Sequence, residues 1–137
     1  MKSFKNSLLV IAVLVIAAVG VFTSALPVQA QSNRYAVVCL FNNTDLPINY
    51  QYKWGNGSWE SDTLDAGYNM THSWKYARGL VSSPKFTVKF DADLTDSNYY
   101  EVYSLERYQA TNKSCEEGKI YNFEFADSRY IDLYSDN

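Results

Sequence analysis

Histidine and cysteine are scarce in this chain of 137 residues, which has one histidine, His72, and two cysteines, Cys39 and Cys115. A single histidine excludes a metal centre built from several histidines and allows a Ser-His-Asp triad in only one way. His72 alternates in phase with Met70 and Trp74 on a face that we expect to point inward. The sequence therefore predicts a core histidine and not a catalytic one.

The sequence also lacks a phosphate-binding glycine loop, a dinucleotide fingerprint and any cluster of basic residues. Removing the first 30 residues, interpreted below as a signal, leaves ten basic and 15 acidic residues, a net charge of −5 with His72 neutral. Nucleic acids and anionic membranes attract proteins through basic patches that displace counterions. Neither is an expected partner of the mature form, and no cofactor is predicted.

Residues 1–30 have the pattern of a secretory signal peptide. Lys2 and Lys5 form a basic start, residues 8–22 are almost all apolar, and residues 28–30 place small side chains before Gln31. An uncleaved anchor is the alternative, but polar residues and a proline interrupt the run before the roughly 20 residues that a membrane-spanning helix needs. We therefore expect a secreted or periplasmic protein whose single domain spans residues 31–137.

Both cysteines lie in the mature chain, and an exported chain with an even number of cysteines favours a disulfide between Cys39 and Cys115. Closing so long a loop is expected to stabilise the fold by at most roughly 4 to 5 kcal/mol on the chain-entropy model. A cysteine nucleophile or metal site is the poorer interpretation, because neither residue has a second cysteine nearby.

An alternation of apolar and polar residues between 47 and 61 predicts a β-hairpin. One face of its first strand would carry Ile48, Tyr50, Tyr52 and Trp54. The turn at residues 55–57 reads Gly-Asn-Gly, which tolerates positive φ, and a second extended run begins at Trp59.

The same period of two recurs in seven further runs, at residues 34–41, 59–64, 70–76, 86–92, 99–109, 121–125 and 130–134. Both faces of 34–41 are apolar, which indicates a central strand. The alternation changes phase within 99–109, so we expect either a bulge or cover on both faces. Eight runs with short turns predict an all-β fold, an antiparallel β-sandwich of about seven or eight short strands, with a small closed β-barrel as the alternative.

Aromatic residues are the most abundant candidates for ligand contact, with 12 Tyr and three Trp in the chain. Exposed rings in secreted sandwiches can stack on sugars, and tyrosine also suits protein interfaces. Core packing competes with this interpretation, most strongly for Trp74, whereas Trp54 and Trp59 flank a turn. The predicted ligand-binding residues are Trp54, Asn56, Trp59, Trp74 and Tyr76.

An acidic segment contains Asp91, Asp93, Asp96, Asn98 and Glu101, whose oxygens suit Ca²⁺. It lacks the glycine at the sixth position and the acid at the twelfth position of an EF-hand loop. We expect solvated turn carboxylates here, with a weak calcium site as the alternative. Four N-glycosylation triplets also occur, at residues 42–44, 56–58, 69–71 and 112–114.

The function expected from these patterns is an exported, non-catalytic binding module for a glycan or a protein ligand. One alternative is a small hydrolase that uses carboxylates, for which the candidates are Glu60, Asp62, Glu101 and Glu106. Another is a structural or inhibitory protein of the cell envelope.

Overall fold

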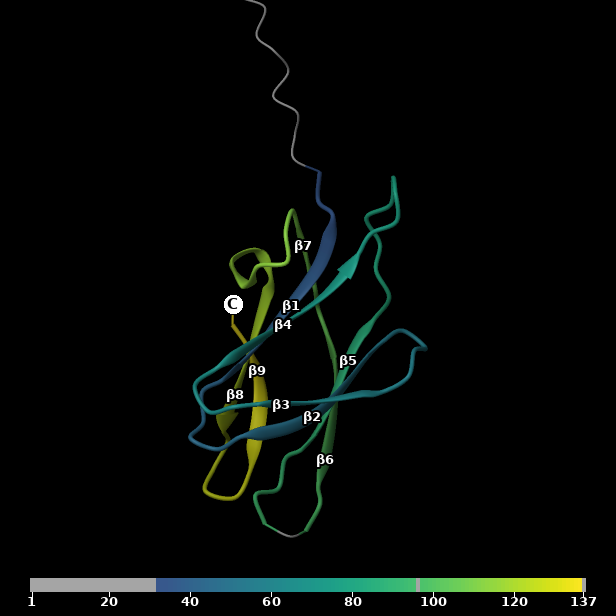
Figure 1. Cartoon of the computed structure of the whole chain (residues 1–137). Helices are drawn as coiled ribbons and strands as arrows, with labels where there is room; N and C mark the ends of the chain where they lie inside the picture. The colour runs from purple at the N-terminus through teal and green to yellow at the C-terminus, as the bar shows by residue number, and fades with distance from the viewer. Residues whose placement is uncertain (1–31, 96, 137) are drawn as a thin grey trace, which may run out of the picture.

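The computed structural model describes residues 32–95 and 97–136, and they form two β-sheets packed face to face (Figure 1). The predicted signal at residues 1–30 lies outside the described residues. The strands are β1 (Tyr35–Asn42), β2 (Ile48–Trp54), β3 (Glu60–Leu64), β4 (Asn69–Lys75), β5 (Phe86–Asp91), β6 (Tyr100–Leu105), β7 (Tyr108–Ala110), β8 (Lys119–Phe125) and β9 (Ile131–Ser135), with a 3-10 turn η1 (Cys115–Glu117). None of the helices in the described ranges is long and apolar enough to cross a membrane.

The two sheets are named after their central strands. The β1 sheet has the order β4-β1-β8-β9, with β7 also paired to β1, and the β2 sheet has the order β3-β2-β5-β6. All neighbouring strands are antiparallel except β1 and β8, which are parallel. The predicted β-sandwich is thus confirmed, with one parallel pair, and the described strands form two separate sheets in place of the alternative closed barrel.

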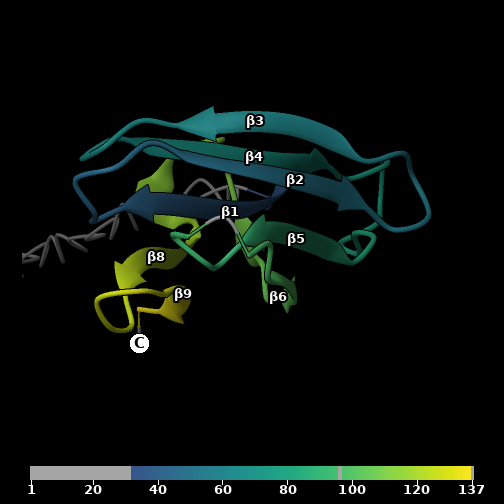
Figure 2. The ribbon, with the colours of Figure 1, turned by 90° about the horizontal axis from the view of Figure 1, so that it is seen from below.

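The edge strands of the two sheets lie along shared margins of the sandwich. Figure 2 shows β3 and β4 along one margin and β6 and β9 along the opposite one. Side chains bridge the sheets at both margins, because Tyr50 and His72 connect β2 with β4, and the Tyr103 hydroxyl donates to Asp132 of β9 at 2.8 Å. The outer face of the β2 sheet points away from these bridges.

The main core lies between the sheets and is built from the inward phase of each strand. Its largest fully buried members include Leu40, Val88, Phe86, Phe90 and Phe123. Core packing, the interpretation that competed most strongly with ligand binding for Trp74, was wrong, since 38% of the Trp74 surface is exposed. Trp74 pairs with Ala36 near the start of β1, so it lies at the end of the sandwich beyond the fully covered interior.

A second, smaller cluster covers the other face of β1 and contains the disulfide. Val37, Cys39 and Ala110 are completely buried there, beneath η1 and the segment that leads to it. Cys39 is bonded to Cys115 with 5.5 Å between their Cα atoms. The predicted central strand and the predicted disulfide are both confirmed, and the bond is typical of a chain that folds in an oxidising compartment.

Neither predicted explanation holds at residues 99–109, because β6 pairs with β5 in unbroken register without a bulge and its outer face is exposed. β6 belongs to the β2 sheet and β7 to the β1 sheet, so the chain crosses between the sheets at residues 106–107. Before the crossing, β6 alternates regularly, with Tyr103 and Leu105 packed in the core. Tyr100 and Val102 occupy its outward phase and are each 55% exposed, so apolar residues occur on both phases of one strand.

Candidate functional site

The outer face of the β2 sheet carries an open hollow of about 700 Å³. Strand pairing places Gln51 between Ser61 of β3 and Lys89 of β5, and it sets Asn49 beside Thr63. These side chains share one phase because the opposite phase of each strand is committed to the core. The hollow is lined by these side chains together with Asp91 and Tyr100, and also by Tyr50, Asp62 and Phe90, which belong to the opposite phase.

Two aromatic rings stand on this face, one toward each edge of the sheet. Trp59 immediately precedes β3 and is 39% exposed, and Tyr100 begins β6 and is 55% exposed. The Lys89 ammonium lies between them, 5.9 Å from the Trp59 ring centroid and 5.0 Å from that of Tyr100. Lys53 also approaches the Trp59 ring, at 4.8 Å. Cation–π contacts of this kind orient a ring while leaving much of its surface in solvent.

Side-chain hydrogen bonds order the amide groups on this face. The Thr63 hydroxyl donates to Asn49 Oδ1 at 2.7 Å, and Gln51 Nε2 donates to Ser61 Oγ at 3.3 Å. Within the described residues, the Asn49 amide NH₂ and the Gln51 carbonyl oxygen make no hydrogen bond to protein. The face therefore offers a donor and an acceptor in fixed positions beside the two rings.

The five predicted ligand-binding residues do not form one site. Trp59 lies on the outer face of the β2 sheet, and Asn56 lies exposed at the tip of the hairpin between β2 and β3. Trp54 points to the other side of β2, where its ring centroid is 4.7 Å from Phe86 and 5.7 Å from Trp74. Tyr76 is half-buried just beyond the end of β4.

Lys89 and Tyr100 were missed as site residues by reasoning from the sequence. Their signal was present, because both occupy the polar or outward phase of strands whose other phase is apolar. The order of the strands in the sheet, β3-β2-β5-β6, could not be predicted from the sequence. Only this order brings Trp59, Lys89 and Tyr100 together.

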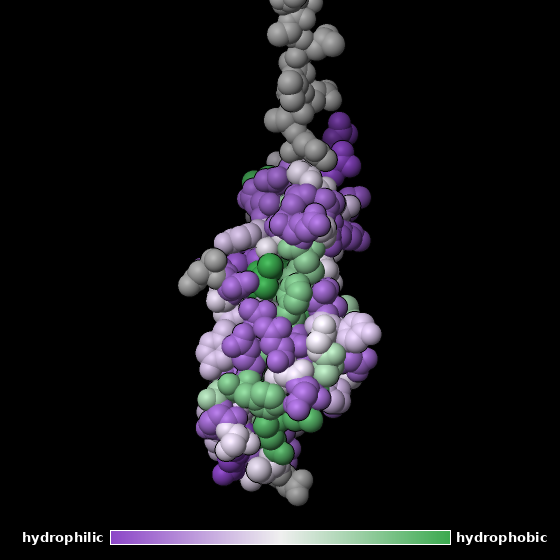
Figure 3. All heavy atoms as spheres, turned by 90° about the vertical axis from the view of Figure 1, so that its left-hand side faces the viewer, coloured by the Kyte–Doolittle hydropathy of each residue, from purple (hydrophilic) through white to green (hydrophobic). Residues whose placement is uncertain are grey.

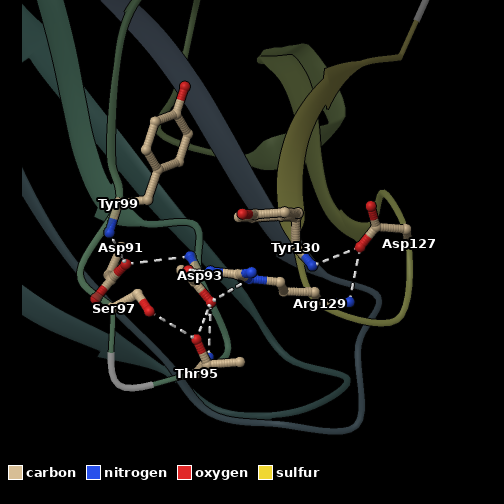
Figure 4. A network of polar contacts seen from close by, with 8 residues as sticks. All are labelled: Asp91, Asp93, Thr95, Ser97, Tyr99, Asp127, Arg129 and Tyr130. Atoms are coloured by element: carbon tan, nitrogen blue, oxygen red, sulfur yellow. Dashed lines mark hydrogen bonds and ion pairs between the residues drawn. The ribbon is translucent and has the colours of Figure 1, made fainter.

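The acidic segment forms a network within the protein, shown in Figure 4. Asp93 accepts from the Arg129 guanidinium at 2.7 Å and from the Thr95 hydroxyl at 2.7 Å. Asp91 accepts from the backbone N–H of Asp93 at 3.1 Å and from that of Tyr99 at 2.9 Å. These contacts fasten the turn between β5 and β6 to the turn between β8 and β9.

The Asp93 side chain is 1% exposed, and its hydrogen bonds with Arg129 and Thr95 hold its pKa well below the usual range. The described residues contain no group of three or more acidic, histidine or cysteine side chains arranged to hold a metal ion. Asp96 lies outside the described residues. In this network Asp91 and Asp93 are committed to structural contacts, which leaves the calcium alternative without support from them.

His72 is a core residue in the structure, as predicted. It is 6% exposed, its Nε2 lies 2.9 Å from the Tyr50 hydroxyl, and its ring packs on Tyr52 at 4.1 Å between centroids. Burial lowers the pKa of His72 to about 4. Beside it, the Tyr52 hydroxyl donates to Glu60 at 2.6 Å, and this hydrogen bond raises the pKa of Tyr52 to about 12.

The carboxylates considered for a hydrolase are divided between two margins. Glu60 and Asp62 lie on β3, and Glu101 lies on β6 at the opposite edge of the same sheet. Three strand spacings separate those edges by roughly 14 Å, more than the 5 to 9.5 Å between paired carboxylates of glycosidases. Glu60 is further engaged by Tyr52.

The glycosylation triplets differ in accessibility. The Asn42 side chain is 1% exposed and donates to the carbonyls of Leu46 at 2.7 Å and Leu64 at 2.9 Å, so it cannot accept a glycan in the folded chain. Burial was hidden in the sequence because Asn42 follows an apolar run directly and resembles a turn residue. The other three acceptors, Asn56, Asn69 and Asn112, are exposed.

A second exposed surface, of apolar character, lies at the end of the sandwich formed by the β1–β2, β5–β6 and β8–β9 turns. Figure 3 shows hydrophobic residues gathered toward the lower end of the molecule. Leu46, Leu94 and Phe125 are 42%, 38% and 44% exposed. Two smaller hollows, of about 320 and 160 Å³, occur in this region. This end differs from the outer face of the β2 sheet, where polar groups and rings alternate.

Comparisons of the chain with protein-family models, with curated proteins and with solved structures found no match. The chemistry of the side chains therefore has to indicate the function. Of the surfaces described, the outer face of the β2 sheet combines the largest hollow with flanking rings, amides, hydroxyls and ammonium groups.

Proposed function

We propose that this protein is an exported, non-catalytic binding module that takes a glycan on the outer face of the β2 sheet. One observation carries the proposal: Trp59 and Tyr100 stand on either side of Lys89, above strands that present amides and hydroxyls outward. Sugar rings present apolar C–H faces and a rim of hydroxyl groups. Rings and polar groups at fixed spacing on a rigid sheet match both features.

The shape of the site supports an oligosaccharide in preference to a small compact ligand. The hollow of about 700 Å³ lies within the range of ligand sites, and it extends over all four strands of the sheet without walls that enclose it. An extended chain of sugars can lie across such a face, with one ring on Trp59 and another on Tyr100.

Export is the second part of the proposal. The disulfide Cys39–Cys115 is compatible with folding outside the reducing cytosol. Residues 1–30 are predicted to be a signal peptide that is removed, and the mature chain would then act in the periplasm or outside the cell.

Titration against a glycan array tests the proposal, with the disulfide-bonded mature chain as the probe. Trp59→Ala is expected to abolish binding to the glycans that the unmodified chain captures. Trp74→Ala is the matched control, because Trp74 is exposed to almost the same extent, 38% against 39%, but lies on the β1 sheet. Loss of binding in the control alone would assign the ligand to the end of the sandwich and overturn the proposed site.

Tyrosine offers a second matched pair. Tyr100→Ala is expected to weaken binding, and Tyr108→Ala is expected to leave it unchanged, since Tyr108 is 50% exposed on a strand of the β1 sheet. An array without any captured glycan, together with recovery of one protein partner in a pull-down that Trp59→Ala abolishes, would replace the glycan by a protein ligand. Release of new reducing ends from a bound glycan would instead indicate a hydrolase.

A further inference from the structure

We infer that the glycan recognised on this face is acidic, with carboxylate groups on its sugars; this inference rests on the proposed function. Two lysines mark the face. Lys53 of β2 and Lys89 of β5 both point outward, and both ammonium groups lie near the Trp59 ring. A sugar that stacks on Trp59 therefore has its substituents within reach of two positive charges.

Within residues 32–95 and 97–136, these ammonium groups have no carboxylate partner. Among the described residues, Arg129 and Asp93 form the single ion pair, at the far end of the sandwich. Lys89 and Lys53 contact rings in place of acids, although the whole chain has a net charge of −3. A protein with an excess of acidic residues thus leaves two lysines without an ion pair beside the Trp59 ring.

In the part of the chain that the structure describes, the acidic side chains of the neighbouring strands form no ion pair with the lysines of this face. Glu60 and Asp62 share the phase of Tyr52 and Tyr50, although Asp62 is also one of the residues that line the hollow. Asp91 lines the hollow on the outward phase of β5, and its carboxylate is bound by two backbone N–H groups of the β5–β6 turn.

A carboxylate on the ligand would fill the position between the rings. The Lys89 ammonium has three N–H donors, and a charge-assisted hydrogen bond to a carboxylate is stronger than one to a neutral hydroxyl. Asn49 and Gln51 then form hydrogen bonds with the sugar hydroxyl groups, and Trp59 and Tyr100 stack on the sugar faces. The lysine, the amides and the rings each have a counterpart in an oligouronate.

The test compares each acidic oligosaccharide with its own uncharged form. Tetramers of galacturonate, mannuronate and guluronate are titrated calorimetrically into the disulfide-bonded mature chain, beside the same tetramers with every carboxylate methyl-esterified. At least one tetramer is expected to bind roughly tenfold more tightly than its ester at low salt, and the difference is expected to shrink with added salt.

Two lysine variants locate the preference. Lys89→Gln keeps a hydrogen-bonding side chain but removes the charge, so the acidic tetramer is expected to bind no better than its ester. Lys113→Gln is the matched control, since Lys113 also lies over a ring, that of Tyr35 at 5.6 Å, but on the other sheet. The control is expected to retain the full preference.

The outcomes separate this inference from the proposed function. Equal binding of acid and ester, with loss of both in Trp59→Ala, would overturn the acidic ligand and keep the glycan site. A preference that survives in Lys89→Gln and Lys53→Gln would also overturn the inference. No binding of these tetramers or of any neutral glycan would overturn both.

Discussion

The Tyr50 hydroxyl lies 2.9 Å from His72 Nε2, and this buried contact joins the two sheets of the sandwich. Tyr50 belongs to β2 and is 2% exposed, whereas His72 belongs to β4 and is 6% exposed. An imidazole so enclosed is held in its neutral form, because ionisation would place a charge in the core. The pair therefore couples folding to protonation.

Stability is expected to fall as the pH is lowered from about 6.5 to about 4. The pKa of His72 is about 4 in the folded protein and 6.5 ordinarily, so within this window the unfolded chain binds a proton that the folded chain does not. The free energy of unfolding is expected to decrease by about 3 kcal/mol across the window and to stay constant above it. Urea unfolding at pH 7.5, 6.0 and 4.5 measures this loss.

His72→Gln is the control for the pH dependence. Glutamine keeps a polar group for Tyr50 but does not titrate, so the variant is expected to start less stable and to lose little further stability between pH 6.5 and 4.5. An unchanged slope in this variant would show that other groups cause the acid sensitivity.

The ion pair of Asp93 and Arg129 makes the stability of the fold depend on pH in a second, more acidic range. Because its partners hold the pKa of Asp93 far below the ordinary value of 3.8, its stabilisation is complete above that pH and is lost as the pH falls below it. Arg129→Gln is expected to lower the melting temperature at pH 7 and to weaken the pH dependence below 4. Arg78→Gln, a substitution at an exposed arginine, is the control and is expected to melt as the unmodified protein does.

Reduction of the disulfide is expected to destabilise the fold. Cys39 and Cys115 are 76 residues apart, and the bond restricts the unfolded chain by at most roughly 4 to 5 kcal/mol on the entropy model. Urea unfolding with and without reductant measures the difference. A thiol assay on the native, unreduced protein is expected to find no reactive thiol, and two reactive thiols would contradict the bond.

The sequence predicted the strands better than their partners. Alternation located the run at 48–54, because its inward and outward residues face core and water consistently. The same logic failed at 99–109, where Tyr100 and Val102 lie on the exposed phase of β6. The chain then changes sheet between Leu105 and Tyr108, and no local signal marks the crossing. The parallel pairing of β1 and β8 was also hidden, because pairing depends on contacts between residues about 80 positions apart.

The candidate site was predictable only in part for the same reason. Trp59 was identified because it follows a glycine-rich turn, and a turn leaves its flanking side chains free to face solvent. Lys89 and Tyr100 gained significance from strand order alone, since β5 and β6 bring them within 6 Å of each other. Alternation favoured core packing for Trp74 because it reports the phase of a residue and not its distance from the end of a sheet.

Substitution of Gly118 is expected to disturb the smaller cluster around the disulfide. A Cβ atom at this position would lie 2.8 Å from Val37 Cγ1 and 3.1 Å from Cys39 Sγ. Gly118→Ala is expected to cost roughly 1 to 3 kcal/mol of stability through overpacking. Val37→Ala in the same chain is expected to recover part of this loss. Purely additive losses in a double-mutant cycle would contradict the overpacking explanation.

Trp54 and Trp59 flank one turn and are expected to respond in opposite ways to truncation. Trp54 packs on Phe86 and Trp74, so Trp54→Ala removes contacts at the end of the core and is expected to cost roughly 3 kcal/mol of stability. Trp59 rests on lysine side chains with 39% of its surface exposed, so Trp59→Ala is expected to cost under about 1 kcal/mol.

Urea unfolding measures both losses of stability. Glycan titration of the same samples is expected to rank the two variants the other way, with binding lost in Trp59→Ala and retained in folded Trp54→Ala. Acrylamide quenching adds an independent reading, since removal of Trp59 is expected to remove an accessible component of the fluorescence. A stability loss in Trp59→Ala as large as that in Trp54→Ala would make Trp59 a structural residue. The outer face of the β2 sheet would then lose the ring on which the proposed binding depends.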